Sequence, residues 1–143
     1  MVVVLIITAF PSFSQEVNSI EKVKNSFLEG WNKRNHNEID KIYADSILFH
    51  GKRDFIITRD GLPNHIDRWH EAFADFKYKI HHIIVQNDLV AVNSSFTGTH
   101  IKKFKGIEGL NNKIDVHNMF FFRFDQEHIV EIWEVHDETT FIN

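Results

Sequence analysis

Glu134 and His136 stand two positions apart in a largely apolar stretch near the C-terminus. Side chains at alternate positions of a β-strand point to the same face, so a strand here places both residues beside Ile132. A carboxylate among apolar side chains is poorly solvated, which raises its pKa toward neutrality and suits it to remove a proton from carbon. Glu134 is therefore the first candidate for acid–base chemistry.

The preceding apolar stretch supplies the surroundings of this carboxylate. Asn118, Phe120 and Phe122 stand at alternate positions and share one face of a predicted strand. If that face lines a cavity, Glu134 lies among aromatic rings, with Asn118 and His136 near it. Such a group combines a base with polar side chains that can hold an enolate oxygen.

Two other interpretations of Glu134 stay open. The carboxylate can be structural, paired with a lysine or arginine at the edge of the sheet. A shift of one residue in strand register turns the other face inward, and Glu131 and Trp133 then point into the cavity.

Histidine is the other residue type with chemical potential, and the sequence has ten. His100, at the end of a predicted strand, can donate to a carbonyl or enolate oxygen, or it can simply bond to backbone. His65 and His70 are five apart on a predicted helix and do not share a face, whereas His81 and His82 point to opposite faces of a strand. These spacings match no zinc site, and we predict no metal site.

The elements that position these residues follow in the order α-α-β-α-β-β-β-β. Apolar residues recur at helical spacing up to Phe73, and the period becomes two after Phe76. This order predicts an α+β fold, in which N-terminal helices pack on a curved antiparallel sheet. The predicted helices begin at Asn18, Asn37 and Leu62; the strands cover residues 46–50, 77–86, 89–100, 114–125 and 129–136, and residues 51–59 are expected to form a loop.

Composition narrows the class of protein further. A chain of 143 residues suffices for one domain, and 14 phenylalanines give it either a bulky core or a ring-lined cavity. Trp31, Tyr43 and Trp69 lie on helical stripes and are either core residues or a wall of that cavity. The net charge of −4 and the lack of a basic stripe argue against nucleic acid as a partner. Without cysteine, the chain has no disulfide and no thiolate chemistry.

The first 14 residues differ from the rest. An apolar run ends at Pro11 and is followed by Ser12 and Ser14, a pattern that predicts a signal peptide cleaved before Gln15. A buried N-terminal strand and an uncleaved anchor are the alternatives, although the run is shorter than the ~20 residues of a membrane span. We therefore expect an exported domain of residues 15–143, without stable membrane insertion.

Five stretches carry a family resemblance. Phe96–His100 (FTGTH) is followed by Phe104–Ile107 (FKGI), and the last strand pair contains Phe122–Phe124 (FRF) and Ile129–Asp137 (IVEIWEVHD). Residues 69–76 (WHEAFADF) end the third predicted helix. These stretches resemble the SnoaL-like polyketide cyclases and ester cyclases of the NTF2-like superfamily.

The resemblance implies a cone-shaped NTF2-like fold and a homodimer packed through the sheets. It also implies ring closure of a polyketide ester by intramolecular aldol chemistry, without metal or organic cofactor. The proton-shuttling carboxylate of the family falls on Glu134. A histidine found in some cyclases falls on Phe120, and a nearby polar position falls on Asn118.

From these observations we expect a cofactor-free acid–base enzyme, a cyclase, isomerase or hydrolase, acting on an apolar carbonyl compound. Glu134 is the expected proton shuttle, with His100 and Asn118 as polar helpers. The alternative is an exported binding or dimeric accessory module without turnover. A small apolar or aromatic ligand is expected to contact Trp31, Tyr43, Trp69, Phe120, Phe122 and His136.

Overall fold

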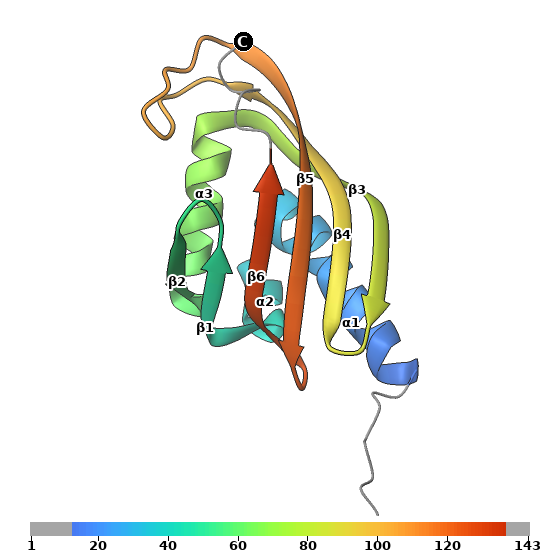
Figure 1. Cartoon of the computed structure of the whole chain (residues 1–143). Coiled ribbons are helices and arrows are strands. Elements are labelled where there is room, and N and C mark those ends of the chain that lie inside the picture. The colour runs from blue at the N-terminus through green and yellow to red at the C-terminus, as the bar shows by residue number, and fades with distance from the viewer. Residues whose placement is uncertain (1–12, 137–143) are drawn as a thin grey trace, which may run out of the picture.

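The computed structural model describes residues 13–136 and shows helices covering one face of a curved six-stranded sheet, which confirms the α+β prediction (Figure 1). The sheet does not close into a barrel, and its bend leaves a hollow on the side of the helices. The helices are α1 (Phe13–Asn25), which continues as a π-helix (Ser26–Trp31), α2 (His36–Ile42), and α3 (Leu62–Ala72), which follows a 3-10 turn (Arg59–Gly61). The strands are β1 (Tyr43–His50), β2 (Asp54–Thr58), β3 (Phe73–Gln86), β4 (Leu89–His100), β5 (Asn112–Asp125) and β6 (His128–His136).

The strands lie in the order β2-β1-β6-β5-β4-β3. β3 to β6 form the predicted antiparallel meander, but β1 pairs with β6 in parallel. The expectation of a wholly antiparallel sheet is therefore wrong at this one pairing. No hairpin connects β1 to β6, so the connection does not require the two strands to be antiparallel.

Several boundaries differ from the sequence predictions. β1 begins at Tyr43, which was expected on a helix, and β3 begins at Phe73 rather than at residue 77. Residues 54–58 form β2 rather than a loop, because the three apolar residues Phe55, Ile56 and Ile57 pair with β1 despite the mixed charges around them. α1 begins at Phe13, so Asn18 lies inside the helix and does not cap it. Of the predicted signal segment, residues 1–12 lie outside the described residues, and the export prediction stays a prediction.

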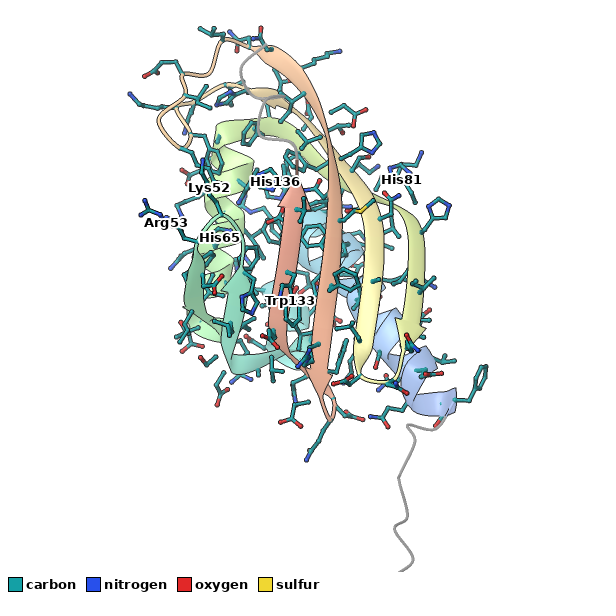
Figure 2. The ribbon with its side chains drawn as sticks, in the orientation of Figure 1. Lys52, Arg53, His65, His81, Trp133 and His136 are labelled. Carbon is teal, nitrogen blue, oxygen red and sulfur yellow. The ribbon has the colours of Figure 1, made fainter. Side chains whose placement is uncertain are left out.

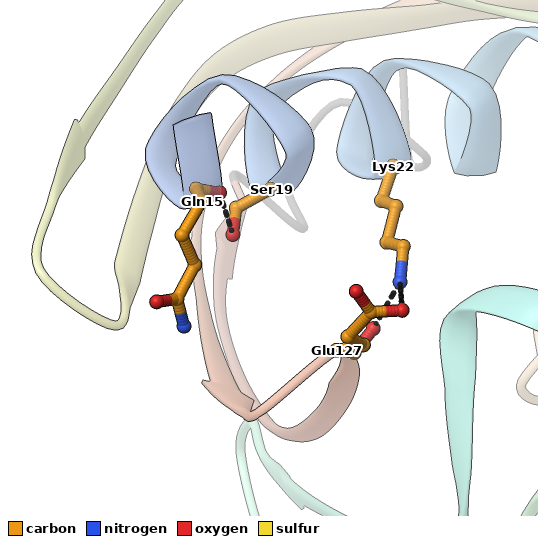
Figure 3. Close-up of polar contacts among 4 residues, drawn as sticks. All are labelled: Gln15, Ser19, Lys22 and Glu127. Carbon is orange, nitrogen blue, oxygen red and sulfur yellow. Dashed lines mark hydrogen bonds and ion pairs between the residues drawn. The ribbon is translucent and has the colours of Figure 1, made fainter. Parts of the chain in front are cut away.

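α1 is held against the far end of the sheet by a polar contact. Lys22 Nζ donates to the backbone oxygen of Glu127 at 2.7 Å and lies 3.2 Å from its carboxylate, in the turn between β5 and β6 (Figure 3). One turn earlier, Ser19 Oγ donates to the backbone oxygen of Gln15 at 3.1 Å. Among the residues described, no helix is both long and apolar enough to cross a membrane.

The core lies between the helices and the concave face of the sheet. β5 alternates strictly between buried and exposed residues, as the period-two pattern predicts. Phe27 of the π-helix is 3% exposed and meets the rings of Tyr78, Phe120 and Phe122 edge-on, at centroid distances of 5.0, 5.5 and 5.8 Å. Edge-to-face packing of this kind adds to the hydrophobic gain of burying each ring.

Candidate active site

A cavity with a free volume of about 50 Å³ lies between the helices and the inner face of β1, β2, β5 and β6. Aromatic rings form most of its wall, and one carboxylate faces it. Its lining residues are Ser26, Phe27, Trp31, Tyr43, Ile47, Phe49, Phe55, Ile57, Leu62, His65, Trp69, Tyr78, Phe120, Phe122, Ile132 and Glu134.

Glu134 is the carboxylate of this cavity. Its side chain is 13% exposed, and its Oε1 accepts a hydrogen bond from Asn118 Nδ2 at 2.9 Å. The same Oε1 lies 3.2 Å from His136 Nδ1. No hydrogen bond from the described residues reaches Oε2. One oxygen is thus held by Asn118 of the neighbouring strand β5 and by His136 of the same strand, while the other is left for a ligand.

The competing interpretations of Glu134 fail on geometry. Glu131 and Trp133 lie on the opposite face, where the carboxylate of Glu131 meets His50 Nε2 at 2.7 Å. The Trp133 ring stacks on His50 at 4.8 Å, and the Arg123 guanidinium lies 5.2 Å from the Trp133 ring. Within residues 13–136, no lysine or arginine forms an ion pair with Glu134. The predicted register is therefore confirmed.

Two buried phenols face the same space. Tyr43 is 2% exposed, and its hydroxyl lies 2.5 Å from Ser26 Oγ. Burial raises the pKa of Tyr43 to about 12, against the opposing hydrogen bonds with Ser26 and Trp31. Burial also raises the pKa of Tyr78 well above its ordinary value, and the nearby charge of Glu134 adds to this. Both phenols therefore keep their protons and can serve as hydrogen-bond donors.

His65 of α3 is the fifth polar side chain of the cavity wall, and its side chain projects from that helix (Figure 2). The indole N–H of Trp69 donates to His65 Nε2 at 3.2 Å. Burial lowers the pKa of His65 to about 4; the charges of Arg68 and Lys105 lower it further, and Glu134 opposes them. The imidazole is neutral at ordinary pH.

The depressed pKa of His65 makes folding stability depend on pH. Between pH 6.5 and about 4, His65 is protonated in the unfolded chain but not in the folded chain. The contribution of the neutral His65 to the free energy of unfolding is complete above pH 6.5 and is lost as the pH falls toward 4. At 1.36 kcal/mol per pH unit, the free energy of unfolding falls by about 3 kcal/mol over this range. Urea unfolding at pH 7 and pH 4.5 is expected to show a smaller loss for His65→Asn than for the wild type. The exposed His82, replaced in the same way, is the control; equal losses in both variants contradict the assignment.

The structure brings most of the predicted site residues together. Trp31, Tyr43, Trp69, Phe120 and Phe122 line the cavity as expected of a ligand wall. Asn118 and His136 are not part of the lining; both contact Glu134 instead.

His100 lies apart from this group. It is 3% exposed at the end of β4, stacks on Phe73 at 4.7 Å, and does not line the cavity. It stands three alternate positions beyond Ser94, the residue that pairs with Asn118, and its role as a polar helper of Glu134 stays a prediction.

His65, Tyr78 and Ser26 also line the cavity, and none of them was predicted from the sequence. The spacing of Leu62, His65 and Trp69 on α3 was a usable signal, because all three fall on one helical face. No sequence pattern predicted Ser26, because its hydrogen bond with the hydroxyl of Tyr43 forms only in the folded chain.

Two further histidines have structural contacts. His70 Nε2 lies 2.7 Å from the backbone oxygen of Trp31, and His81 Nε2 lies 2.9 Å from Ser95 Oγ. Among residues 13–136, no three His, Asp or Glu side chains lie close enough together to hold a metal ion.

Helices packed on an open, bent sheet around a carboxylate-bearing cavity define a small pocket protein of the NTF2-like kind. The profile of the SnoaL-like polyketide cyclase family matches residues 21–143. Since this match covers most of the sequence, the chain belongs to that family. A search among curated proteins gives no match.

Solved structures agree with the fold. A protein assigned as a SnoaL-like polyketide cyclase from Jannaschia sp. CCS1 superposes with a TM-score of 0.80 at 17% identity, over 94% of this chain and 95% of that one. One assigned as a polyketide cyclase from Acidithiobacillus ferrooxidans gives 0.77 at 19% identity, over 92% and 95%. IdmH from Streptomyces antibioticus, also assigned as a polyketide cyclase, gives 0.73 at 20% identity, over 87% and 95%. At these identities the likeness establishes the fold alone.

Proposed function

We propose that this chain is a cofactor-independent acid–base enzyme that moves a proton at carbon in a small carbonyl compound, with Glu134 as the proton-transferring group. One observation carries the proposal: a carboxylate that is 13% exposed faces a ring-lined cavity with one oxygen held and the other available. Membership of the SnoaL-like family supports the same class of reaction.

Each neighbour of Glu134 has a distinct task in this proposal. Asn118 and His136 hold Oε1 and so fix the direction of Oε2. Positioning a base in this way removes part of the entropic barrier to proton transfer. Tyr78, a neutral phenol close enough to sense the charge of Glu134, donates to the oxygen that becomes negative as the proton leaves.

The size of the cavity limits the substrate. A volume of about 50 Å³ holds only a few water-sized groups, so the enclosed part of the ligand has a few heavy atoms. Larger ligands have to extend through the opening or displace part of the wall.

Hydrogen–deuterium exchange tests the proposal without knowledge of the natural substrate. In deuterium oxide, the protein is expected to accelerate exchange of the α-protons of small ketones such as 2-butanone and levulinate, followed by proton NMR. Exchange at the buffer rate for every ketone that binds would reject proton transfer. It would favour the alternative function, a ligand-binding module that uses the same cavity without turnover.

We also propose that the protein is a homodimer joined through the outer face of the sheet. Ile84, Met119, Phe121 and Val135 are 68, 62, 46 and 72% exposed there, an apolar surface that soluble monomers tend to avoid. Met119→Asp is expected to convert a dimer to a monomer in light scattering. The control is Ile56→Asp, a similarly exposed apolar residue on β2; a wild type that is already monomeric at micromolar concentration contradicts the proposal.

Export stays part of the proposal through the N-terminal segment. Mass spectrometry of the natural product is expected to find Gln15 as its first residue, which would shorten α1 by two residues. An intact Met1 would reject cleavage.

A further inference from the structure

His65 and Arg68 bring two nitrogen atoms together beside the cavity. His65 lines the cavity, and Arg68, one turn further along α3, is exposed to solvent. Arg68 Nη2 lies 3.5 Å from His65 Nδ1. The pair therefore stands where the cavity wall meets the solvent.

The tautomer of His65 decides what this contact means. An indole N–H can only donate, so His65 Nε2 accepts from Trp69 and carries no proton. The neutral ring then has its proton on Nδ1. A guanidinium can also only donate, so Arg68 Nη2 and His65 Nδ1 do not form a hydrogen bond with each other. Each offers an N–H group to a third atom that lies between them. Nδ1–H has no acceptor among the described residues.

At this separation, a single oxygen atom can accept hydrogen bonds from both donor nitrogens. An acceptor about 2.9 Å from each nitrogen, the ordinary hydrogen-bond length, fits between donors 3.5 Å apart. Such a shared acceptor is best when it is anionic, because charge-assisted hydrogen bonds are the stronger ones.

The surrounding charges favour an anion at this point. No carboxylate of residues 13–136 forms an ion pair with Arg68 or Lys105. Lys105 Nζ lies 5.4 Å from the centre of the Trp69 ring, next to His65. The charges of both cations add to burial in lowering the pKa of His65. The carboxylate of Glu134 lines the same cavity, and its charge opposes the effect of these two cations on His65.

We infer that His65 Nδ1–H and Arg68 form an anion-binding pair at the mouth of the cavity, which selects carbonyl compounds that carry a carboxylate and orients that carboxylate outward. The uncharged carbonyl part then enters the cavity toward Glu134, and like-charge repulsion from Glu134 prevents the reverse orientation. This inference rests on the proposed function for the role of Glu134, but the selectivity for carboxylates is a binding property and does not require turnover.

A matched pair of ligands tests the selectivity. Levulinate, a short keto acid, and its methyl ester differ in charge but share the same ketone. Titrations followed by tryptophan fluorescence and by ligand NMR are expected to give tighter binding of levulinate than of the ester. Arg68→Gln is expected to weaken levulinate binding about two- to fivefold, the range for a solvent-screened charge contact, and to leave the ester unchanged. Raising the salt concentration is expected to weaken levulinate binding alone.

Further variants separate the pair from general effects of charge. His65→Leu removes the second donor and is expected to reduce the preference for the acid, whereas His65→Gln, which keeps an N–H, retains part of it. Arg123→Gln removes the same charge from the outer face, 47% exposed there, and is expected to change nothing. Equal binding of acid and ester by the wild type, or a preference that survives both Arg68→Gln and His65→Leu, would overturn the inference. If the preference is present but ketone exchange is absent, the anion-binding pair stands and only the proposed proton transfer fails.

Discussion

Replacing Glu134 by glutamine is expected to slow α-proton exchange roughly 100- to 10,000-fold, the usual contribution of a general acid–base group. Glutamine has the same shape and can still accept the hydrogen bond from Asn118 that Oε1 receives at 2.9 Å. The variant should therefore fold and bind ketones while lacking the group that takes the proton. Proton NMR of the exchanging ketone measures the rate, and ligand NMR confirms that binding is kept.

The control for this substitution lies three residues earlier on the same strand. Glu131 faces outward and meets His50 at 2.7 Å, so Glu131→Gln removes an equal charge without entering the cavity. An unchanged exchange rate is expected. A rate in Glu134→Gln equal to that of the wild type would remove Glu134 from the mechanism.

Phe27→Ala is expected to cause the largest loss of stability, about 3–5 kcal/mol. The ring is 3% exposed and touches aromatic rings of both β3 and β5, so its removal leaves a void that the rigid sheet cannot close. Domains of this size are stable by about 5–15 kcal/mol, so the variant is expected to lie near the limit of folding. Urea unfolding monitored by circular dichroism measures the change.

The neighbouring Leu28 provides the comparison, because it lies on the same π-helix but is 45% exposed. Leu28→Ala is expected to change stability by less than about 1 kcal/mol. Similar losses for the two variants would mean that helix propensity, rather than the aromatic cluster, determines the stability of this segment.

Periodic patterns carried most of the fold prediction. The alternation in residues 114–125 matches the strictly alternating burial of β5, and it placed Asn118 and Phe120 correctly. β2 was missed because its short apolar run stands among charged residues and gains its stability from pairing with β1. A local pattern cannot report a pairing partner, and strand propensity depends on that partner.

The candidate site was predictable in part for the same reason. The face of β6 that carries Glu134 follows from alternation, and the contacts from Asn118 and His136 follow from strand neighbourhood. The place of His100 could not be predicted, because alternation of side chains tells which face of β4 a residue lies on but not how far along the strand the cavity extends. The roles of His65 and Arg68 depend on the tautomer set by Trp69, which only the folded arrangement reveals.

The parallel pairing of β1 with β6 has a consequence for how the protein is made. β1 contributes Tyr43, Ile47 and Phe49 to the cavity, and one of its two neighbours in the sheet is β6, the last strand within residues 13–136. A ribosome therefore has to release the chain through β6 before this side of the sheet can assemble. Because closing so long a loop is slow, the cavity is expected to take shape in the final stage of folding, after the meander of β3 to β5 has formed.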